Sequence, residues 1–317
     1  MSIFPTRILL ATDGSEDAES ALSMAVSLAE ATNSELHLMT AARPYHSTYP
    51  DTEYPEALEQ IFEERKREAE QTLEGQAKKV HEAGGTVSGR EVRVWTPDAG
   101  IIGCAEDIEA GIIVMGSRGQ EGISRALLGS ISESVVRHAH CPVIVVRRDE
   151  RIADELFGGK ILVAVDGSDE SELALRTGVE LAEAAGVQLH LVRVAPLESG
   201  WVYPTPYTAE ELSYEEVGDA VLHEHTKRAE SYGGTVAEAH AATGRPDAEI
   251  VRVSEELGVG LIIMGSRGRG ALRRALLDSV SDSVVRHAHC PVMVVREQIP
   301  QVASASKAPR AEEEKQT

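Results

Sequence analysis

The stretch ILLATDGSEDAESAL, from Ile8 to Leu22, joins a continuous apolar run to a helix-forming segment through an Asp-Gly-Ser turn. A run that is apolar at every position is typical of a parallel strand buried on both faces. Ser15 is placed to cap the following helix, and Glu16 and Asp17 lie in its first turn, where the helix dipole favours acidic groups. The stretch therefore predicts a strand, a tight turn and a helix, which is the first unit of an α/β fold.

This unit is repeated in the chain. ILVAVDGSDESELAL, from Ile161 to Leu175, follows the first stretch by 153 residues. A second repeated pair, 116–147 and 265–296, is offset by 149 residues, and 23 of its 32 positions are identical. The chain is therefore two copies of one unit. The predicted domains are 1–150 and 151–299, followed by a polar tail at 300–317 that we expect to be disordered.

Strands and helices alternate within each unit. In the first unit we expect further strands at ELHLMTA, VSGREVRVW, GIIVM and PVIVVR. We expect helices from Pro55 to the Gly84-Gly85 pair, from Pro97 through Glu109, and from Ser130 to His138. This order predicts a doubly wound α/β sheet, which binds ligands beyond the carboxyl ends of its strands. Because Asp13 and Gly116 both directly follow strands, they should lie on the same rim of the sheet.

The composition is strongly acidic. Asp and Glu total 52 against 31 Lys and Arg, a net charge of −21, and the pI is near 4.9. Such a field repels nucleic-acid backbones, so nucleic acid is disfavoured as a partner. Because lysines are few, we also raise the hypothesis of a high-salt cytoplasm. The sequence has neither a membrane-spanning apolar run nor a signal-peptide pattern, so we expect a soluble cytoplasmic protein.

The loop GSRGQEGISRALLGS, from Gly116 to Ser130, has features of a phosphate site. Glycine at 116 permits positive φ and close backbone approach to a ligand. The Gly129-Ser130 pair precedes a helix whose free N–H groups and dipole favour an anion. Arg118 and Arg125 are placed to add charge-assisted hydrogen bonds. Without a lysine after its last glycine, the loop is not a P-loop.

A second interpretation needs no ligand. Ser130-Ile-Ser-Glu133 has the pattern of a capping box, in which serine and glutamate satisfy the first N–H groups of the helix. On the residues alone, phosphate binding is favoured only slightly over a well-capped connector.

The chain resembles a tandem universal stress protein over nearly its whole length. The resemblance rests on Asp13-Gly14-Ser15 and Asp166-Gly167-Ser168, on VMGSRG and IMGSRG, on HAHCPV before each last strand, and above all on the spacing Gly116-x2-Gly119-x9-Gly129-Ser130. In that family this spacing marks the ATP-binding branch. The resemblance implies two Rossmann-like domains, each with a five-stranded, mostly parallel sheet, that pair through their fifth strands, here within one chain, with a homodimer as a further option.

The resemblance also implies a ligand position. Adenine would lie near Thr12, Asp13, Thr40 and Ala41, and the triphosphate, with or without Mg²⁺, would lie on Gly116, Arg118, Gly119, Gly129 and Ser130. The corresponding residues of a second, doubtful site are Asp166, Gly265, Arg267, Gly268 and Ser279.

The second loop, GSRGRGALRRALLDS, differs at its third glycine, which is replaced by Asp278. A carboxylate at a helix N-terminus takes the place of an anion and repels phosphate. The loop has four arginines, at 267, 269, 273 and 274, which would offset that charge. In the first unit, Trp95 stands where the second has Gly244. We interpret Trp95 as a packing residue, with stacking on a ligand as the alternative.

The sequence supports metal binding and enzymatic catalysis less well than nucleotide binding. His138, His140 and Cys141, and their counterparts His287, His289 and Cys290, invite a metal assignment, but no partner motif completes a zinc site, so we predict no metal. No general base is apparent for a dedicated enzyme, although the pattern leaves slow ATP hydrolysis open. We therefore predict an ATP-binding stress-response protein that acts as a switch or scaffold. The alternative is an interaction module that binds no nucleotide.

Overall fold

The computed structural model describes residues 3–42, 55–119, 128–148, 156–195, 214–268 and 279–296. The elements of the first half are β1 (Arg7–Ala11), α1 (Glu16–Thr32), β2 (Glu35–Ala42), α2 (Pro55–Glu82), β3 (Val87–Val94), α3 (Pro97–Asp107), β4 (Ile112–Gly116), α4 (Ser130–His138) and β5 (Val143–Val146). The second half begins with a short 3₁₀ turn, η1 (Leu156–Gly159), and repeats this order as β6 (Lys160–Ala164), α5 (Asp169–Ala185), β7 (Gln188–Ala195), α6 (Tyr214–Ser231), β8 (Val236–Thr243), α7 (Pro246–Leu257), β9 (Leu261–Gly265), α8 (Ser279–His287) and β10 (Val292–Val295).

The helix boundaries follow from local chemistry. Ser15 caps α1 by accepting a hydrogen bond of 3.3 Å from the Ala18 N–H, as predicted. Helix α2 stops at the predicted glycine pair, where Gly84 adopts a φ of +88°. The predicted end of α3 is wrong by two residues. The helix ends at Asp107, because Glu109 takes a left-handed φ of +51° that breaks the helical path.

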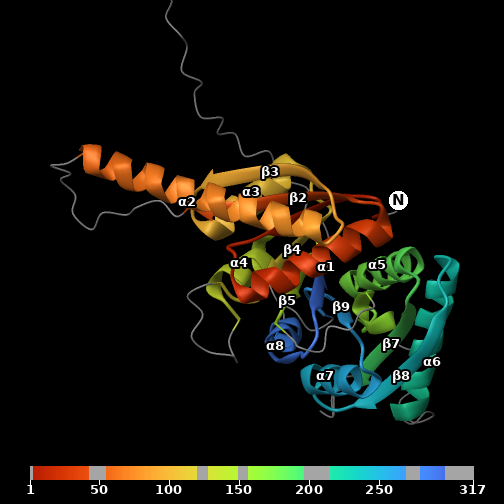
Figure 1. The fold of residues 1–317 in the computed structure, drawn as a ribbon. Helices are drawn as coiled ribbons and strands as arrows, with labels where there is room; N and C mark the ends of the chain where they lie inside the picture. The colour runs from red at the N-terminus through yellow and green to blue at the C-terminus, as the bar shows by residue number, and fades with distance from the viewer. Residues whose placement is uncertain are drawn as a thin grey trace, which may run out of the picture.

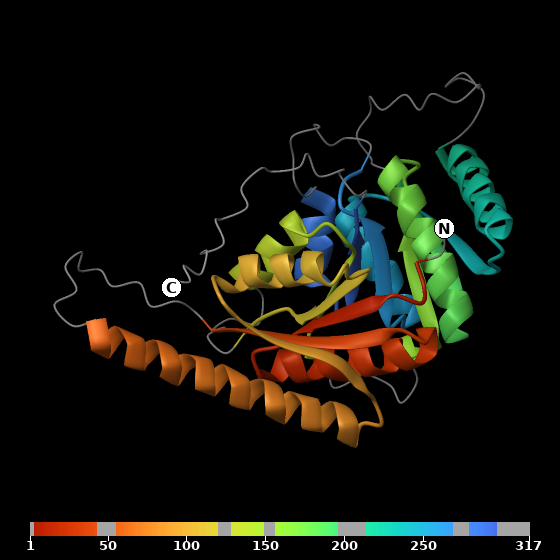
Figure 2. The same cartoon turned by 90° about the horizontal axis from the view of Figure 1, so that it is seen from above.

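All ten strands belong to one sheet, in the order β3-β2-β1-β4-β5-β10-β9-β6-β7-β8. Within each half the neighbouring strands are parallel. Strands β5 and β10 are antiparallel, with Ile144 opposite Met293, and they join the two halves. Near this joint α1 and α5 lie side by side, whereas α2 and α6 lie at opposite ends of the molecule (Figures 1 and 2).

Helices cover both faces of the sheet. One buried cluster lies between the sheet and α1, α2, α5 and α6 and includes Ile8, Leu10, Val114 and Met293. The other lies under α3, α4, α7 and α8 and includes Leu9, Ile113, Val145 and Val294. Alternate residues of the inner strands thus enter opposite layers, which explains why strands such as β4 and β5 are apolar throughout. The fold is the expected pair of doubly wound α/β units.

The antiparallel joint decides where the two candidate sites lie. The strands of the first half run one way and those of the second half run the other way. The carboxyl ends of the two sets therefore face opposite ends of the sheet. Any ligand sites at those ends are separate sites, each of which lies beside the amino end of the other half's last strand. Among the described residues, no helix is long and apolar enough to cross a bilayer.

Candidate functional site: the rim after β1 and β4

The turn after β1 begins the site. Thr12 is buried, and its N–H donates to the Met39 carbonyl of β2 at 2.9 Å. The Asp13 carboxylate accepts a hydrogen bond of 3.0 Å from the Ser15 N–H, which fixes the turn into α1. Thr40 is buried in β2, and Ala41 follows it, next to Arg93 in the register of β3. The structure therefore places all four predicted adenine-site residues at the carboxyl ends of β1 and β2.

Gly116 does not use the positive φ that glycine permits. It is the last residue of β4 and does not take a positive φ. A Cβ atom there would lie 2.9 Å from the Ala18 backbone nitrogen and from the Asp17 carbonyl carbon. Gly265 is in the same position against Glu170 in the second half. This glycine is therefore required for close packing between the fourth strand of each half and the helix that follows its first strand.

The second glycine of the loop lies against the turn. A Cβ atom on Gly119 would come within 2.4 Å of the Asp13 carboxylate, and Gly119 itself is exposed. The loop after β4 and the turn after β1 thus meet with no room for a side chain between them. The sequence predicted this proximity from strand order alone, and the structure places the two segments together.

An acidic residue of α1 holds the next part of the loop. The Asp17 carboxylate is buried, accepts a hydrogen bond of 2.7 Å from the Ser117 hydroxyl and lies 3.3 Å from the Arg118 Nε. The sequence alone assigns Asp17 only a favourable charge near the helix dipole. Its second function is to position Arg118 on the rim. The signal was present in the sequence, because the second half also has an acid, Glu170, at this position.

The predicted capping box is wrong. The N-cap of α4 is Gly129, which has φ −66° and ψ 145° and no side chain to cap with, and Ser130 is the exposed first residue of the helix. The Glu133 carboxylate does not turn back to the helix start. It pairs with Arg137 at 2.7 Å and with Arg286 of α8 at 3.3 Å. Among the residues that the structure describes, the N-cap of α4 therefore provides no side-chain hydrogen bond to the first turn of the helix.

The second half holds its arginine more tightly. The Glu170 carboxylate accepts hydrogen bonds from the Ser266 hydroxyl at 2.9 Å and from the Arg267 backbone N–H and Nε, both at 2.5 Å. It also pairs with the terminal guanidinium nitrogen of Arg267. Asp166 caps its own turn through the Ser168 N–H at 2.9 Å. Gly265 and Gly268 flank Arg267 as expected, and Ser279 begins α8 and is exposed.

Several residues of the sequence analysis cannot be placed. Asp278, Arg125, the arginines at 269, 273 and 274, and the tail at 300–317 lie outside the described residues. The comparison of the two loops therefore rests on their beginnings and on the two helix starts.

The sequence analysis predicts that Trp95 is a packing residue, but the structure places it on the surface. Its side chain is 63% exposed, just beyond the end of β3. A Cβ atom on Gly100 would lie 3.8 Å from both the Trp95 and Ala41 Cβ atoms, so the indole is attached close to the end of β2. The packing interpretation is wrong, and Trp95 belongs to the surroundings of the rim.

Each rim also contacts the other half through an arginine. Arg147 follows β5, and its guanidinium donates to the Arg286 carbonyl at the end of α8. In the second half Arg296 donates to the Arg137 carbonyl at the end of α4 and to the Val136 carbonyl at 3.2 Å. Burial lowers the pKa of Arg147, and the nearby charge of Arg118 lowers it further. Arg147 thus connects the first rim electrostatically to the last helix of the second half.

The HAHC segments have structural roles in the described residues. The His138 Nδ1 lies 2.8 Å from the Ser134 carbonyl, and the His287 Nδ1 lies 2.7 Å from the Ser283 carbonyl, one helical turn back in each case. Cys141 is buried, and burial raises the pKa of its thiol to about 12. A thiol that stays protonated is a poor nucleophile.

Together, the rims and the joint define a tandem of two doubly wound α/β units with a glycine-lined rim in each half. A model of the universal stress protein family matches residues 5–147 and 159–296. A universal stress protein of Mycobacterium tuberculosis is 28% identical over 291 residues, which cover 92% of this chain and 97% of the relative. One from Mycolicibacterium smegmatis is 31% identical over 290 residues, covering 91% of this chain and 96% of the relative.

A solved structure agrees with these sequence matches. The crystal structure of a universal stress protein from Archaeoglobus fulgidus superimposes with a TM-score of 0.69 at 25% identity, covering 93% of this chain and 97% of that one. The chain belongs to the universal stress protein family.

Proposed function

We propose that this universal stress protein binds ATP, with or without Mg²⁺, on the rim of its first half and acts as a nucleotide-dependent switch or scaffold. The adenine would lie near Thr12, Asp13, Thr40 and Ala41, and the phosphates near the loop from Gly116 to Gly119 and the start of α4 at Gly129 and Ser130.

The observation that carries the proposal is the start of α4. Gly129 supplies no side-chain cap, and a Cβ atom there would lie 3.1 Å from the Ser117 carbonyl, so the backbone is held close to the loop. A helix start whose N-cap residue has no side chain favours phosphate oxygens, because the free N–H groups and the helix dipole attract an anion. Arg118 lies on the same loop, where its positive charge would complement those oxygens.

The second half is less suited to the same ligand. Glu170 neutralises Arg267 with more hydrogen bonds than Asp17 makes to Arg118. An arginine already paired with a buried carboxylate gains less by turning to a phosphate. We therefore propose one strong site per chain, in the first half, and a weak or vacant second one.

We propose binding rather than dedicated turnover. Asp17, a buried carboxylate beside the loop, already accepts hydrogen bonds from Ser117 and Arg118, so it is poorly placed to accept a proton from an attacking water. A switch is supported by the contacts of Glu133 and Arg147 with Arg286 of α8, which connect the proposed phosphate site to the second half.

The test is equilibrium binding of ATP to the full chain and to two variants. We expect about one equivalent for the wild type, a loss of at least about 100-fold in affinity for Gly129→Asp, and a gain of second-site binding for Asp278→Gly. Aspartate is a good N-cap residue, which favours a folded α4 in Gly129→Asp. Gly129→Ala is the matched control, because it adds the same Cβ atom 3.1 Å from the Ser117 carbonyl without the negative charge.

The rival is an interaction module that needs no nucleotide. No ATP binding by the folded wild type would support the rival, whereas equal binding by wild type and Gly129→Asp would overturn the proposed phosphate position at the start of α4. Mass spectrometry of any small molecule that copurifies with the chain then gives the nucleotide's identity, ATP or AMP.

A further inference from the structure

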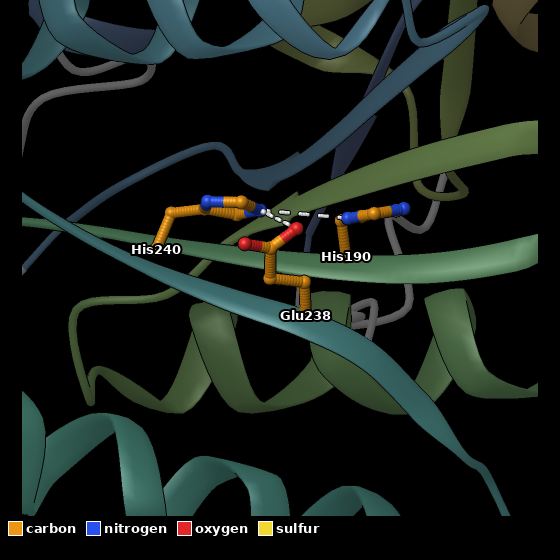
Figure 3. Close-up of side chains that lie close together, drawn as sticks. All are labelled: His190, Glu238 and His240. Carbon is orange, nitrogen blue, oxygen red and sulfur yellow. Dashed lines mark hydrogen bonds and ion pairs between the residues drawn. The ribbon is translucent and has the colours of Figure 1, made fainter.

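Three potential metal ligands meet on the second half of the sheet, away from both rims. His190 lies on β7, and Glu238 and His240 lie on the neighbouring strand β8. In the strand register His190 is directly opposite Glu238, and His240 is two residues further along β8. Because side chains two residues apart project from the same face of a strand, the three side chains gather on one face (Figure 3).

The ligand atoms are close enough to share one ion. The His190 Nδ1 and the His240 Nε2 face each other at 3.4 Å, and the Glu238 carboxylate lies 3.8 Å from that Nε2 (Figure 3). All three atoms lie within 4.8 Å of one another. Zinc bonds of about 2.0–2.1 Å in tetrahedral geometry place ligand atoms about 3.3–3.4 Å apart, so small side-chain rotations would complete the site.

The buried histidine directs one ring nitrogen at the cluster. His190 is 5% exposed, and its Nδ1 faces the His240 Nε2. Two imidazole nitrogens that face each other at 3.4 Å are held together either by an N–H of one ring that donates to the lone pair of the other or by a cation that both nitrogens coordinate. A carboxylate directed at the same point adds a negative charge, which favours a dication.

The three side chains differ in exposure in the way that a metal site open to solvent on one side requires. The His190 side chain is buried, the His240 side chain is 18% exposed and that of Glu238 is 62% exposed. A metal held by these three groups would be fixed on its inner side and would reach solvent on its outer side. Lys160, whose charge also acts on His190, donates to the Leu257 carbonyl at 3.3 Å and so is held toward the end of α7.

The first half provides an internal comparison. His37 occupies the position of His190, but Gly89 replaces Glu238 and Glu91 replaces His240. A Cβ atom on Gly89 would lie 2.4 Å from the His37 Nδ1, so the His37 ring fills the space where the carboxylate would stand. The His37 ring lies 3.4 Å from Glu35 on its own strand instead. Two substitutions therefore separate a three-ligand cluster from a single histidine in an otherwise similar place.

We propose that His190, Glu238 and His240 bind one Zn²⁺ ion, with water as the fourth ligand, and that the ion fastens the edge strand β8 to β7. Two imidazoles, one carboxylate and an open position form a ligand set that zinc accepts. The site lies apart from the proposed ATP site and does not depend on it.

The test is zinc titration of the untagged, metal-free full chain by calorimetry, with Co²⁺ absorption spectra as a second readout of coordination. We expect one tight equivalent, with tetrahedral Co²⁺ bands. His240→Ala and Glu238→Gln should weaken binding by at least about 100-fold and about 10-fold, since even outer-shell changes cost 10–100-fold. His37→Ala, at the matched position of the first half, should change nothing.

Thermal unfolding separates binding from folding defects. Zn²⁺ should raise the Tm of the wild type and of His37→Ala and leave that of His240→Ala unchanged. His240 and Glu238 are preferred to the buried His190 for substitution because the chain should fold without them. Absence of zinc binding by the folded wild type overturns the proposal in favour of a proton shared between two histidines. Equal zinc affinity in wild type and in the His240→Ala, Glu238→Gln double variant overturns it as well.

Discussion

The two halves share their backbone design but differ in how an acid holds the arginine of the loop. In the first half Asp17 contacts Arg118 through one nitrogen at 3.3 Å. In the second half Glu170, longer by one methylene, reaches the backbone N–H of Arg267 and both sides of its guanidinium. The buried acid therefore makes more hydrogen bonds to the loop arginine in the second half than in the first.

The same contrast recurs on the outer strands. Gly89 and Glu91 of the first half correspond to Glu238 and His240 of the second, and only the second set brings three ligand atoms together among the described residues. The repeated fold therefore supports different chemistry at equivalent places. Comparing paired variants, one in each half, is the most direct way to test these differences.

The largest expected effect comes from removing each buried acid. Glu170→Ala should lower the free energy of unfolding by about 3 kcal/mol and Asp17→Ala by about 2 kcal/mol, because hydrogen bonds to buried charged groups are each worth about 1.5–3 kcal/mol. Denaturant unfolding of both variants measures the difference. Equal losses would show that the additional bonds of Glu170 contribute nothing to stability.

Exchanging the two acids should alter nucleotide affinity more than stability. Asp17→Glu should draw Arg118 toward the carboxylate, as Glu170 draws Arg267, and weaken ATP binding about tenfold, the equivalent of about 1.4 kcal/mol. Glu170→Asp should free Arg267 and leave the first site unchanged. ATP titrations of both variants measure this, and an unaltered affinity in Asp17→Glu would remove Arg118 from the proposed phosphate site.

The smallest expected effect on stability concerns two equivalent aspartates, Asp98 of α3 and Asp247 of α7. They lie on the face of the sheet opposite α1 and α5. Burial acts to raise the pKa of Asp98 and of Asp247, but hydrogen bonds from Ser134 at 2.8 Å and Ser283 at 2.7 Å help to bring both pKa values below their ordinary range. Asp247 also has Arg245 at 2.8 Å as a partner. Loss of the serine should therefore raise the pKa of Asp98 more than that of Asp247.

The stability effect of this pair depends on pH. A depressed aspartate pKa stabilises the folded state above the unfolded pKa of about 3.9, and this stability is lost as the pH falls through the folded pKa. Ser134→Ala should cost less than about 1.5 kcal/mol at pH 7, and its deficit relative to wild type should shrink below about pH 4. Ser283→Ala should show a smaller deficit. Unfolding curves from pH 2 to 7 measure both, and pH-independent deficits would contradict the assignment.

The sequence predicted the strands, most helix boundaries and the meeting of Asp13 with the loop after β4. These features depend on local patterns and on the rule that parallel strands end at one rim. The role of Gly116 was not predictable, because the close approach of Asp17 and Ala18 depends on how tightly α1 packs on β4. The capping box failed for a similar reason, since Glu133 found arginines, one of them on α8, a helix 149 residues away in the repeat.

No sequence motif predicts the cluster of His190, Glu238 and His240. His190 lies about 50 residues before Glu238 and His240, and a one-residue slip in the register of β7 and β8 would turn one strand's ligands to the opposite face. The pairing of the three side chains depends on the register of β7 and β8, which the sequence patterns of the two strands do not specify.

The antiparallel contact between β5 and β10 also affects how the protein can change over time. In a dimer of identical single domains, every substitution appears twice, and the two sites must remain the same. Covalent linkage makes the contact independent of protein concentration and lets each half accumulate its own substitutions. Asp17 and Glu170, or Gly89 and Glu238, are the kind of divergence that such a fused pair allows and an identical pair forbids.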